Sequence, residues 1–78
     1  MVVQAYVLIQ TESGRAAEVT TKINEVGGVV TADYVTGPYD VIVQAEAPHV
    51  DDLARMVVAR LQSIDGITRT LTCPVVHL

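Results

Sequence analysis

The chain has 78 residues and a formal net charge of −4, and half of its residues are hydrophobic. This length predicts one domain, residues 1–78. Its five Lys and Arg residues are scattered, so we expect no basic surface for phosphate backbones and no direct binding to nucleic acid. No apolar stretch approaches about 18 residues, so a membrane span is not expected. The start lacks the basic flank of a signal peptide, which favours a cytoplasmic location.

Self-association follows from the same numbers. A domain this small buries only roughly 60% of its unfolded surface. Because half of the residues are hydrophobic, apolar surface remains after one core has been built. A symmetric oligomer buries such surface.

The first half of the chain predicts a strand and a helix. Residues 2–10 are rich in β-branched side chains and alternate between two faces, which indicates a strand. Residues 14–26 predict a helix, capped by Ser13 and ended by Gly27 and Gly28. Its buried stripe has a spacing of three or four residues and consists of Ala16, Val19, Ile23 and Val26.

The second half predicts a hairpin, a second helix and a last strand. Residues 29–36 and 39–47 form two strands joined by a short connection at Gly37, which makes them antiparallel. A helix opens at Pro48 and ends before Gly66. Its predicted buried stripe is Val50, Leu53, Val57, Leu61 and Ile64, and residues 67–76 follow as the last strand.

The order β-α-β-β-α-β predicts an α+β fold of the ferredoxin-like type. Four strands form one antiparallel sheet, and both helices cover the same face. The other face is expected to carry Tyr6, Leu8, Ile42, Gln44, Thr70 and Thr72. This mixture suits sheet-to-sheet packing in a dimer, with Tyr6, Leu8 and Ile42 at its centre. The alternative is an exposed face of ordinary β-formers.

Cys73 is the only cysteine, so an internal disulfide is impossible. We expect it on the same strand face as Leu71 and Val75, pointing into the core, where a thiol reacts slowly. The other metal-binding candidates, His49 and His77, form no recognisable ligand set. No metal and no cofactor are expected.

A search for catalytic groups predicts no enzyme. Asp51 and Asp52 are adjacent on a helix and therefore point in different directions. They fit the favourable first turn of a helix better than acid–base chemistry. His49 lies at a helix start, and no nucleophile and base can be paired by spacing.

A dense group of candidate residues joins the two middle strands: Tyr34, Gly37, Pro38, Tyr39 and Asp40. Gly37 permits a close backbone approach and Pro38 stiffens the turn. Unpaired amides there could bind a carboxylate while Asp40 binds an ammonium group, which matches an amino-acid zwitterion. From the residues alone, a plain hairpin turn with Asp40 capping its own backbone remains the simpler interpretation.

These elements resemble a known family. The element order, the stretch TGPYDV at 36–41 and the stretch ITRTLT at 67–72 are similar to the effector-binding domain of the leucine-responsive and asparagine (Lrp/AsnC) regulators. That domain is also called the regulation-of-amino-acid-metabolism (RAM) domain. The resemblance covers essentially the whole chain. Family members usually carry an N-terminal helix-turn-helix, whereas this chain begins at the first strand, so it resembles the stand-alone versions.

The resemblance implies a site and partners. Two such domains pack sheet to sheet, dimers assemble into rings, and small effectors, mostly amino acids, bind between dimers near the Gly-x-Tyr-Asp turn. Gly37, Tyr39 and Asp40 map onto that turn, with Pro38 inside it. Thr70 and Thr72 map onto the polar stretch of the last strand, and Tyr34 is placed by proximity. A full-length regulator of the family is a further expected partner.

Two alternatives stay open. The first is an enzyme of the dimeric α+β-barrel class, which needs a polar pocket between sheet and helices. The predicted interior positions there are all apolar: Val3, Ala5, Val7, Ile9, Val41, Val43 and Ala45. The second alternative is a structural interaction module without a ligand.

Overall fold

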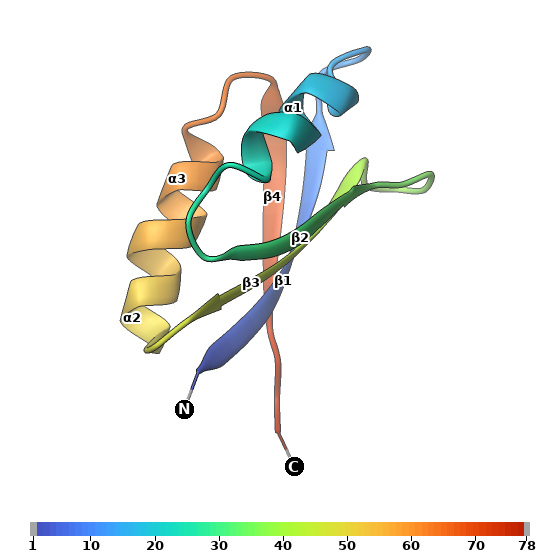
Figure 1. Cartoon of the computed structure of the whole chain (residues 1–78). Helices are drawn as coiled ribbons and strands as arrows, with labels where there is room; N and C mark the ends of the chain where they lie inside the picture. The colour runs from blue at the N-terminus through green and yellow to red at the C-terminus, as the bar shows by residue number, and fades with distance from the viewer. Residues whose placement is uncertain (1, 78) are drawn as a thin grey trace.

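The computed structural model describes residues 2–77 and has one antiparallel sheet covered on one face by helices (Figure 1). The four strands lie in the order β2-β3-β1-β4. Together with the two helical regions, this confirms the predicted ferredoxin-like fold. The elements in chain order are β1 (Val3–Thr11), α1 (Ala16–Ile23), β2 (Val29–Tyr34), β3 (Val41–Ala47), α2 (Val50–Asp52), the π-helical segment η1 (Leu53–Val58), α3 (Ala59–Gln62) and β4 (Ile67–Pro74).

The core lies between the helices and the inward faces of the central strands. Side chains alternate between the two faces of β1 and β3, and those on the inward face have no exposed surface. They are Ala5, Val7 and Ile9 on β1 and Val41, Val43 and Ala45 on β3. From the helices, Val19, Ile23, Val57 and Leu61 fill the same layer. The predicted stripes are therefore confirmed except at Val50, which is 63% exposed.

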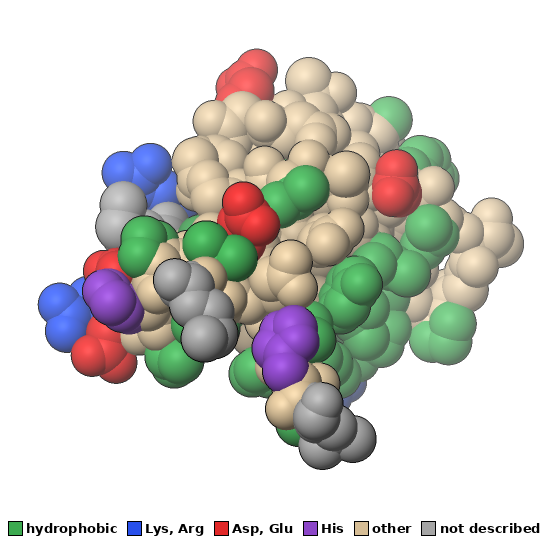
Figure 2. All heavy atoms as spheres, turned by 60° about the horizontal axis from the view of Figure 1, so that its bottom comes forward, with side chains coloured by type: hydrophobic (Ala, Val, Ile, Leu, Met, Phe, Trp, Pro, Cys, Tyr) green, Lys and Arg blue, Asp and Glu red, His purple; other side chains and the backbone are tan. Residues whose placement is uncertain are grey.

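We call the sheet face away from the helices the outer face. Tyr6, Leu8 and Ile42 lie on it, as predicted, alternating with the buried residues. Leu8 is central, because it pairs with Ile42 on β3 and with Leu71 on β4. Three side chains on this face are substantially exposed in the single chain: Tyr6, Ile42 and Leu71, by 45%, 37% and 43%. Figure 2 shows hydrophobic side chains gathered in a continuous area on one side of the molecule.

The last strand presents its side chains in the opposite sense from the prediction. Gln10 pairs with Arg69, but the next residue, Thr11, pairs with Ile67, so Thr68 is an extra residue in β4. Such a bulge shifts the alternation by one position. Ile67 faces inward, and simple alternation from it would place Arg69, Leu71 and Cys73 inward as well. Because of the bulge, each residue after Thr68 lies on the opposite face from the one that simple alternation predicts.

The corrected assignment exchanges two pairs of residues. Thr70 and Thr72 pair with the inward-facing Ile9 and Val7, so they face the helices. Leu71 and Cys73 pair with Leu8 and Tyr6 and lie on the outer face. Cys73 is exposed, so the prediction that it is a core residue was wrong.

The first helix is shorter than predicted and begins differently. It starts at Ala16 with Arg15 in the capping position, and no side chain caps it, so the expected role of Ser13 was wrong. The Arg15 guanidinium instead contacts Glu18 at 2.6 Å and Asp65 at 3.2 Å. It thereby links the start of α1 to the turn before β4. The hydrogen bond that Arg15 donates, together with its positive charge, lowers the pKa of the Glu18 carboxyl below its usual value.

The second helical region packs closely against the turn before β2. Gly28 has a φ of +93°, and a Cβ atom there would lie 2.6 Å from Cγ2 of Val57. Val57 belongs to the π-helical segment between α2 and α3. Gly28 therefore serves both the turn and the packing, because no other residue fits this space without displacing its neighbours. No helix within residues 2–77 has the length and apolar character to cross a membrane.

Candidate functional site

The connection between β2 and β3 is a loop that is fastened to the end of β1. The backbone amide of Asp40 donates to the carbonyl of Ile9 at 2.8 Å, and Val35 donates to the carbonyl of Asp40 at 2.9 Å. The amide of Thr11 donates to Oδ2 of Asp40 at 2.8 Å, and its hydroxyl lies 3.3 Å from the same oxygen. The Gln10 side chain donates to the carbonyl of Pro38 at 3.0 Å. The loop is thus held in one conformation from the neighbouring strand.

These contacts correct the simpler interpretation of Asp40. Its carboxylate does not cap its own turn, since Oδ2 accepts from Thr11, 29 residues away in sequence. Asp40 is half-buried, and its other oxygen, Oδ1, has no hydrogen-bond donor among residues 2–77. One oxygen of Asp40 therefore orders the loop, and the other is left for a further donor.

The tip of the loop presents backbone donors. In the part of the chain that the structure describes, no acceptor is found for the amides of Thr36, Gly37 and Tyr39. Gly37 has an ordinary φ, and a Cβ atom there would meet nothing within 4 Å. The backbone conformation and the packing of the described chain therefore do not require glycine at position 37.

The tyrosines and the proline of the group surround this tip. Tyr34 closes β2 opposite Val41 and is 63% exposed. Pro38 is exposed, whereas Tyr39 is half-buried. The structure therefore brings the five predicted loop residues into one ordered segment.

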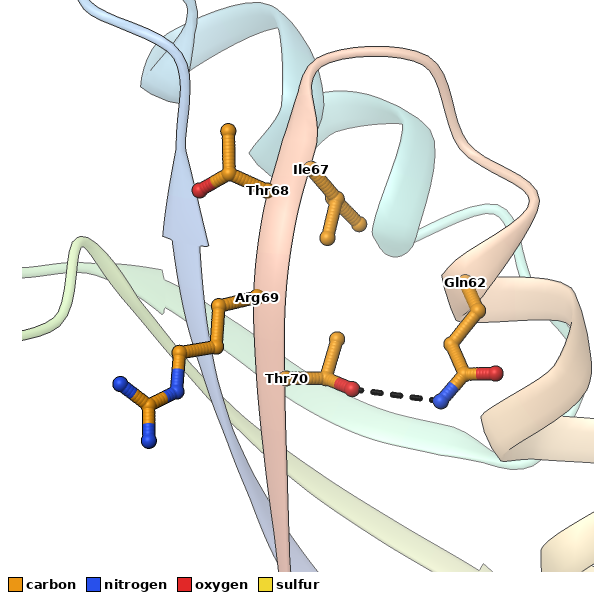
Figure 3. A pocket seen from close by; sticks show the side chains of 5 residues that line it. All are labelled: Gln62, Ile67, Thr68, Arg69 and Thr70. Atoms are coloured by element: carbon orange, nitrogen blue, oxygen red, sulfur yellow. Dashed lines mark hydrogen bonds between the residues drawn. The ribbon is translucent and has the colours of Figure 1, made fainter.

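Thr70 and Thr72 are separated from the loop within one subunit. Thr70 pairs with Ile9 on the opposite side of β1 from Val41, two strand spacings away, which is about 10 Å. Its hydroxyl accepts a hydrogen bond from Gln62 of α3 at 3.3 Å. Figure 3 shows Thr70 and Ile67 pointing toward α3 while Arg69 and Thr68 point to the other side of the strand.

Each threonine borders a different hollow. Thr70 contributes, with Gln62 and Arg69, to an open hollow of about 250 Å³ at the edge strand. Thr72 borders an apolar hollow of about 210 Å³ beside the π-helical segment, together with Leu53 and Val58. Neither hollow includes a residue of the loop. Within this chain the two threonines and the loop therefore do not share a hollow.

The interior offers no reactive group. Among residues 2–77 no polar or charged residue is buried. No group of three or more His, Cys, Asp or Glu in this range is close enough to hold a metal ion. The dimeric α+β-barrel enzymes need a polar pocket between sheet and helices; among the described residues the polar side chains there, Gln62 and Thr70, line an open hollow at the edge of the sheet.

The two residues that hold the loop, Gln10 and Thr11, were not predicted from the sequence. Gln10 and Thr11 hold it through contacts between residues 28 and 29 positions apart. No local pattern signals such contacts, although polar residues at the end of an otherwise apolar strand are a hint.

Family comparison agrees with this architecture. A family model described as the Lrp/AsnC ligand binding domain matches residues 4–77. The chain belongs to the Lrp/AsnC family. The predicted resemblance is thereby confirmed over nearly its whole length.

Individual proteins match this chain over most of its length. An uncharacterized helix-turn-helix-type transcriptional regulator of Pyrococcus furiosus is 30% identical over 71 residues, or 87% of this chain and 47% of that protein. The chain thus spans about half the length of this curated relative. A solved protein from Thermus thermophilus is 29% identical with a TM-score of 0.89, and the match covers 97% of this chain and 95% of that one.

A more distant neighbour shares the fold. A transcriptional regulator from Neisseria meningitidis, solved as a complex with L-Met, is 19% identical with a TM-score of 0.82. The match covers 96% of this Lrp/AsnC-family chain and 50% of the regulator.

Proposed function

We propose that this chain is an amino-acid-binding, self-associating regulatory module of the Lrp/AsnC family. The family assignment supports the general role, since the matching model describes a ligand-binding domain. The L-Met complex of the N. meningitidis regulator makes a free amino acid a reasonable ligand class.

The observation that carries the proposal is the ordered loop at Gly37 to Asp40. A zwitterion offers a carboxylate and an ammonium group a few ångströms apart. The loop presents free amides at Thr36, Gly37 and Tyr39 for the first, and the unpaired Oδ1 of Asp40 for the second. Because Gln10 and Asp40 already fix the loop, little conformational entropy is lost on binding.

The ligand would complete its site between subunits. Thr70 and Thr72 lie across β1 from the loop, so a second subunit is needed to bring such residues close to it. A ligand held in this way favours one assembly over others, and it can do so only through different affinities for those assemblies. We propose that dimers, and rings of dimers, are these assemblies.

The partner would be another protein with the same outer face. Full-length regulators of the family are the candidates, and one relative of this chain is described as a helix-turn-helix-type transcriptional regulator. We propose that this chain joins or modulates them in the cytoplasm, where transcription regulators act. Direct nucleic-acid binding by this chain alone is not part of the proposal, because its net charge is −4.

Equilibrium dialysis against each standard amino acid tests the proposal, combined with light scattering of the same samples. We expect at least one amino acid to bind and to change the average mass of the assembly. An Asp51→Asn variant is a control, since Asp51 is an exposed carboxylate on α2. Absence of binding for every amino acid at millimolar concentration would leave a structural interaction module as the better description.

A further inference from the structure

Three consecutive residues at the end of β1 hold the loop between β2 and β3, and each uses a different group. The carbonyl of Ile9 accepts from the backbone amide of Asp40 at 2.8 Å. Thr11 donates its own amide to the Asp40 carboxylate at 2.8 Å. Gln10, between them, reaches the loop through its side chain, whose Nε2 donates to the carbonyl of Pro38 at 3.0 Å. The first two contacts use backbone atoms of β1, so the Gln10 contact is the one that a substitution on this strand removes cleanly.

The carbonyl that Gln10 holds belongs to the same peptide group as the amide of Tyr39. No cis peptide bond occurs within residues 2–77, and in a trans peptide the C=O and N–H bonds point in opposite directions. A donor that fixes the Pro38 carbonyl on one side therefore directs the Tyr39 N–H to the other side. That N–H is one of the three donors at the tip of the loop for which the described chain offers no acceptor.

The bond from Gln10 restricts the rotation of this peptide group. The ring of Pro38 fixes its own φ, so the plane turns about ψ of Pro38 and φ of Tyr39. The next peptide group along the chain is held separately, because the Asp40 amide donates to Ile9. Both peptide groups that flank Tyr39 are thus anchored to β1. A donor to a carbonyl also polarises the N–H of the same group, which makes the Tyr39 amide a better partner for an anion.

We propose that Gln10 is a positioning residue for the carboxylate of the bound amino acid and acts through the peptide group between Pro38 and Tyr39. The inference rests on the amino-acid binding in the proposed function, and it adds a residue that sets affinity for one end of the zwitterion without touching it. Asp40 then serves the ammonium end and Gln10 the carboxylate end. The Gln10 bond is exposed to solvent, and a bond of this kind changes an equilibrium about three- to tenfold.

Gln10→Met tests this role, because methionine has nearly the same length but no N–H donor. Selective isotope labelling of tyrosine makes an NMR measurement specific, since the chain has three tyrosines. Glycine is the probe, because it carries both ends of the zwitterion and no side chain for which a pocket is needed. Glycinamide at about pH 6 is its partner probe, since it keeps the ammonium group and replaces the carboxylate by a neutral carboxamide.

The two probes should respond differently to the substitution. In the wild type, glycine should shift the Tyr39 amide signal more than glycinamide does at the same concentration. In Gln10→Met the dissociation constant for glycine should rise about three- to tenfold, and that for glycinamide should stay the same. Without any probe, the Tyr39 signal of the variant should move or broaden, because its peptide group turns more freely. The signal of Tyr6 is an internal reference, since Tyr6 lies in the paired part of β1.

Gln44→Met is the matched control. Gln44 on β3 pairs with Tyr6 and so shares the outer face, four residues along β1 from Gln10. Both glutamines are half-buried in the single chain. The Gln44→Met variant should bind glycine as the wild type does and leave the Tyr39 signal in place. Thermal melts check that both variants are folded.

The outcomes separate this inference from the proposed function. If Gln10→Met weakens glycine and glycinamide equally, Gln10 only stiffens the loop, and the positioning role is wrong while amino-acid binding stands. Unchanged glycine affinity in Gln10→Met, or glycine binding that leaves the Tyr39 signal unmoved, would overturn the inference in the same way. So would a wild type that binds another amino acid but not glycine, even at high millimolar concentration, because the loop then does not hold the part that all amino acids share. A wild type that binds no amino acid at all would overturn the proposed function, and this inference with it.

Discussion

Oδ2 of Asp40 accepts a hydrogen bond from the backbone amide of Thr11 at 2.8 Å, which ties the β2–β3 loop to the end of β1. An asparagine can keep this bond, because its side-chain carbonyl is also an acceptor, but it loses the charge. The two roles of Asp40, ordering the loop and receiving an ammonium group, are therefore separable by experiment.

The Asp40→Asn variant should keep its fold and lose its ligand. Removing one partner of a partly buried charged hydrogen bond costs about 2–5 kcal/mol, so affinity should fall roughly thirty-fold or more. The melting temperature should barely change, whereas Asp40→Ala should lower it as well. Calorimetry with the amino acid that the wild type binds measures the first effect. Undiminished affinity in Asp40→Asn would show that the carboxylate only orders the loop.

The Leu8→Lys variant should be monomeric. Leu8 pairs with both Ile42 and Leu71 at the centre of the outer face, and burying each such side chain contributes about 1.5–3 kcal/mol. In a sheet-to-sheet dimer, a lysine from each chain would place two ammonium groups in an otherwise apolar interface. Light scattering of the folded variant at micromolar concentration measures the mass, with Thr21→Lys on the exposed side of α1 as the control. A Leu8→Lys dimer of wild-type affinity would mean that another surface joins the subunits.

The rate at which a thiol reagent labels Cys73 should depend on whether the chain is monomeric or dimeric. It is exposed in one subunit and pairs with Tyr6 on the outer face, so a sheet-to-sheet dimer would cover it. We expect rapid labelling by a thiol reagent in monomeric Leu8→Lys and slower labelling in the wild type. Slow labelling in both proteins would place Cys73 inside the subunit after all, and rapid labelling in both would mean that the dimer leaves this part of the face open.

Two glycines should behave in opposite ways when replaced by alanine. At Gly28 the positive φ and the 2.6 Å approach to Val57 should cost about 1–3 kcal/mol of unfolding free energy, because an overpacked site must shift its neighbours. At Gly37 the added methyl group meets only open space, so stability should change by less than about 0.5 kcal/mol. Urea unfolding compares the two. Reduced ligand affinity in Gly37→Ala with intact stability would support the loop as a site.

Duplex DNA should not bind to this chain alone. The net charge of −4 opposes contact with phosphates, and a specific complex normally survives about 150 mM salt. A gel shift at that ionic strength checks this. A shifted band from the 78-residue chain would require a positively charged surface that its assembly creates.

The sequence predicted those parts of the fold in which a regular repeat decides the outcome. On β1 the alternation from Ala5 to Ile9 identified the buried face, and on α1 the spacing of Val19 and Ile23 did the same. The prediction of which side chains face inward was wrong for the last strand, because the extra residue, Thr68, is not marked by a residue type such as glycine that is typical of bulges. The loop was identified as a candidate, but its fixed geometry depends on contacts between residues far apart in the sequence.

The same extra residue determines what β4 offers to other molecules. If Thr68 were instead paired regularly in the ladder, with Ile67 still inward, Leu71 and Cys73 would turn toward the helices and Thr70 and Thr72 outward. Arg69 would leave the outer face in the same step. A chain that pairs this strand without the bulge thus presents a different outer surface, although its composition and element order are the same. Two such chains would not recognise each other through this face, even with identical ligand loops.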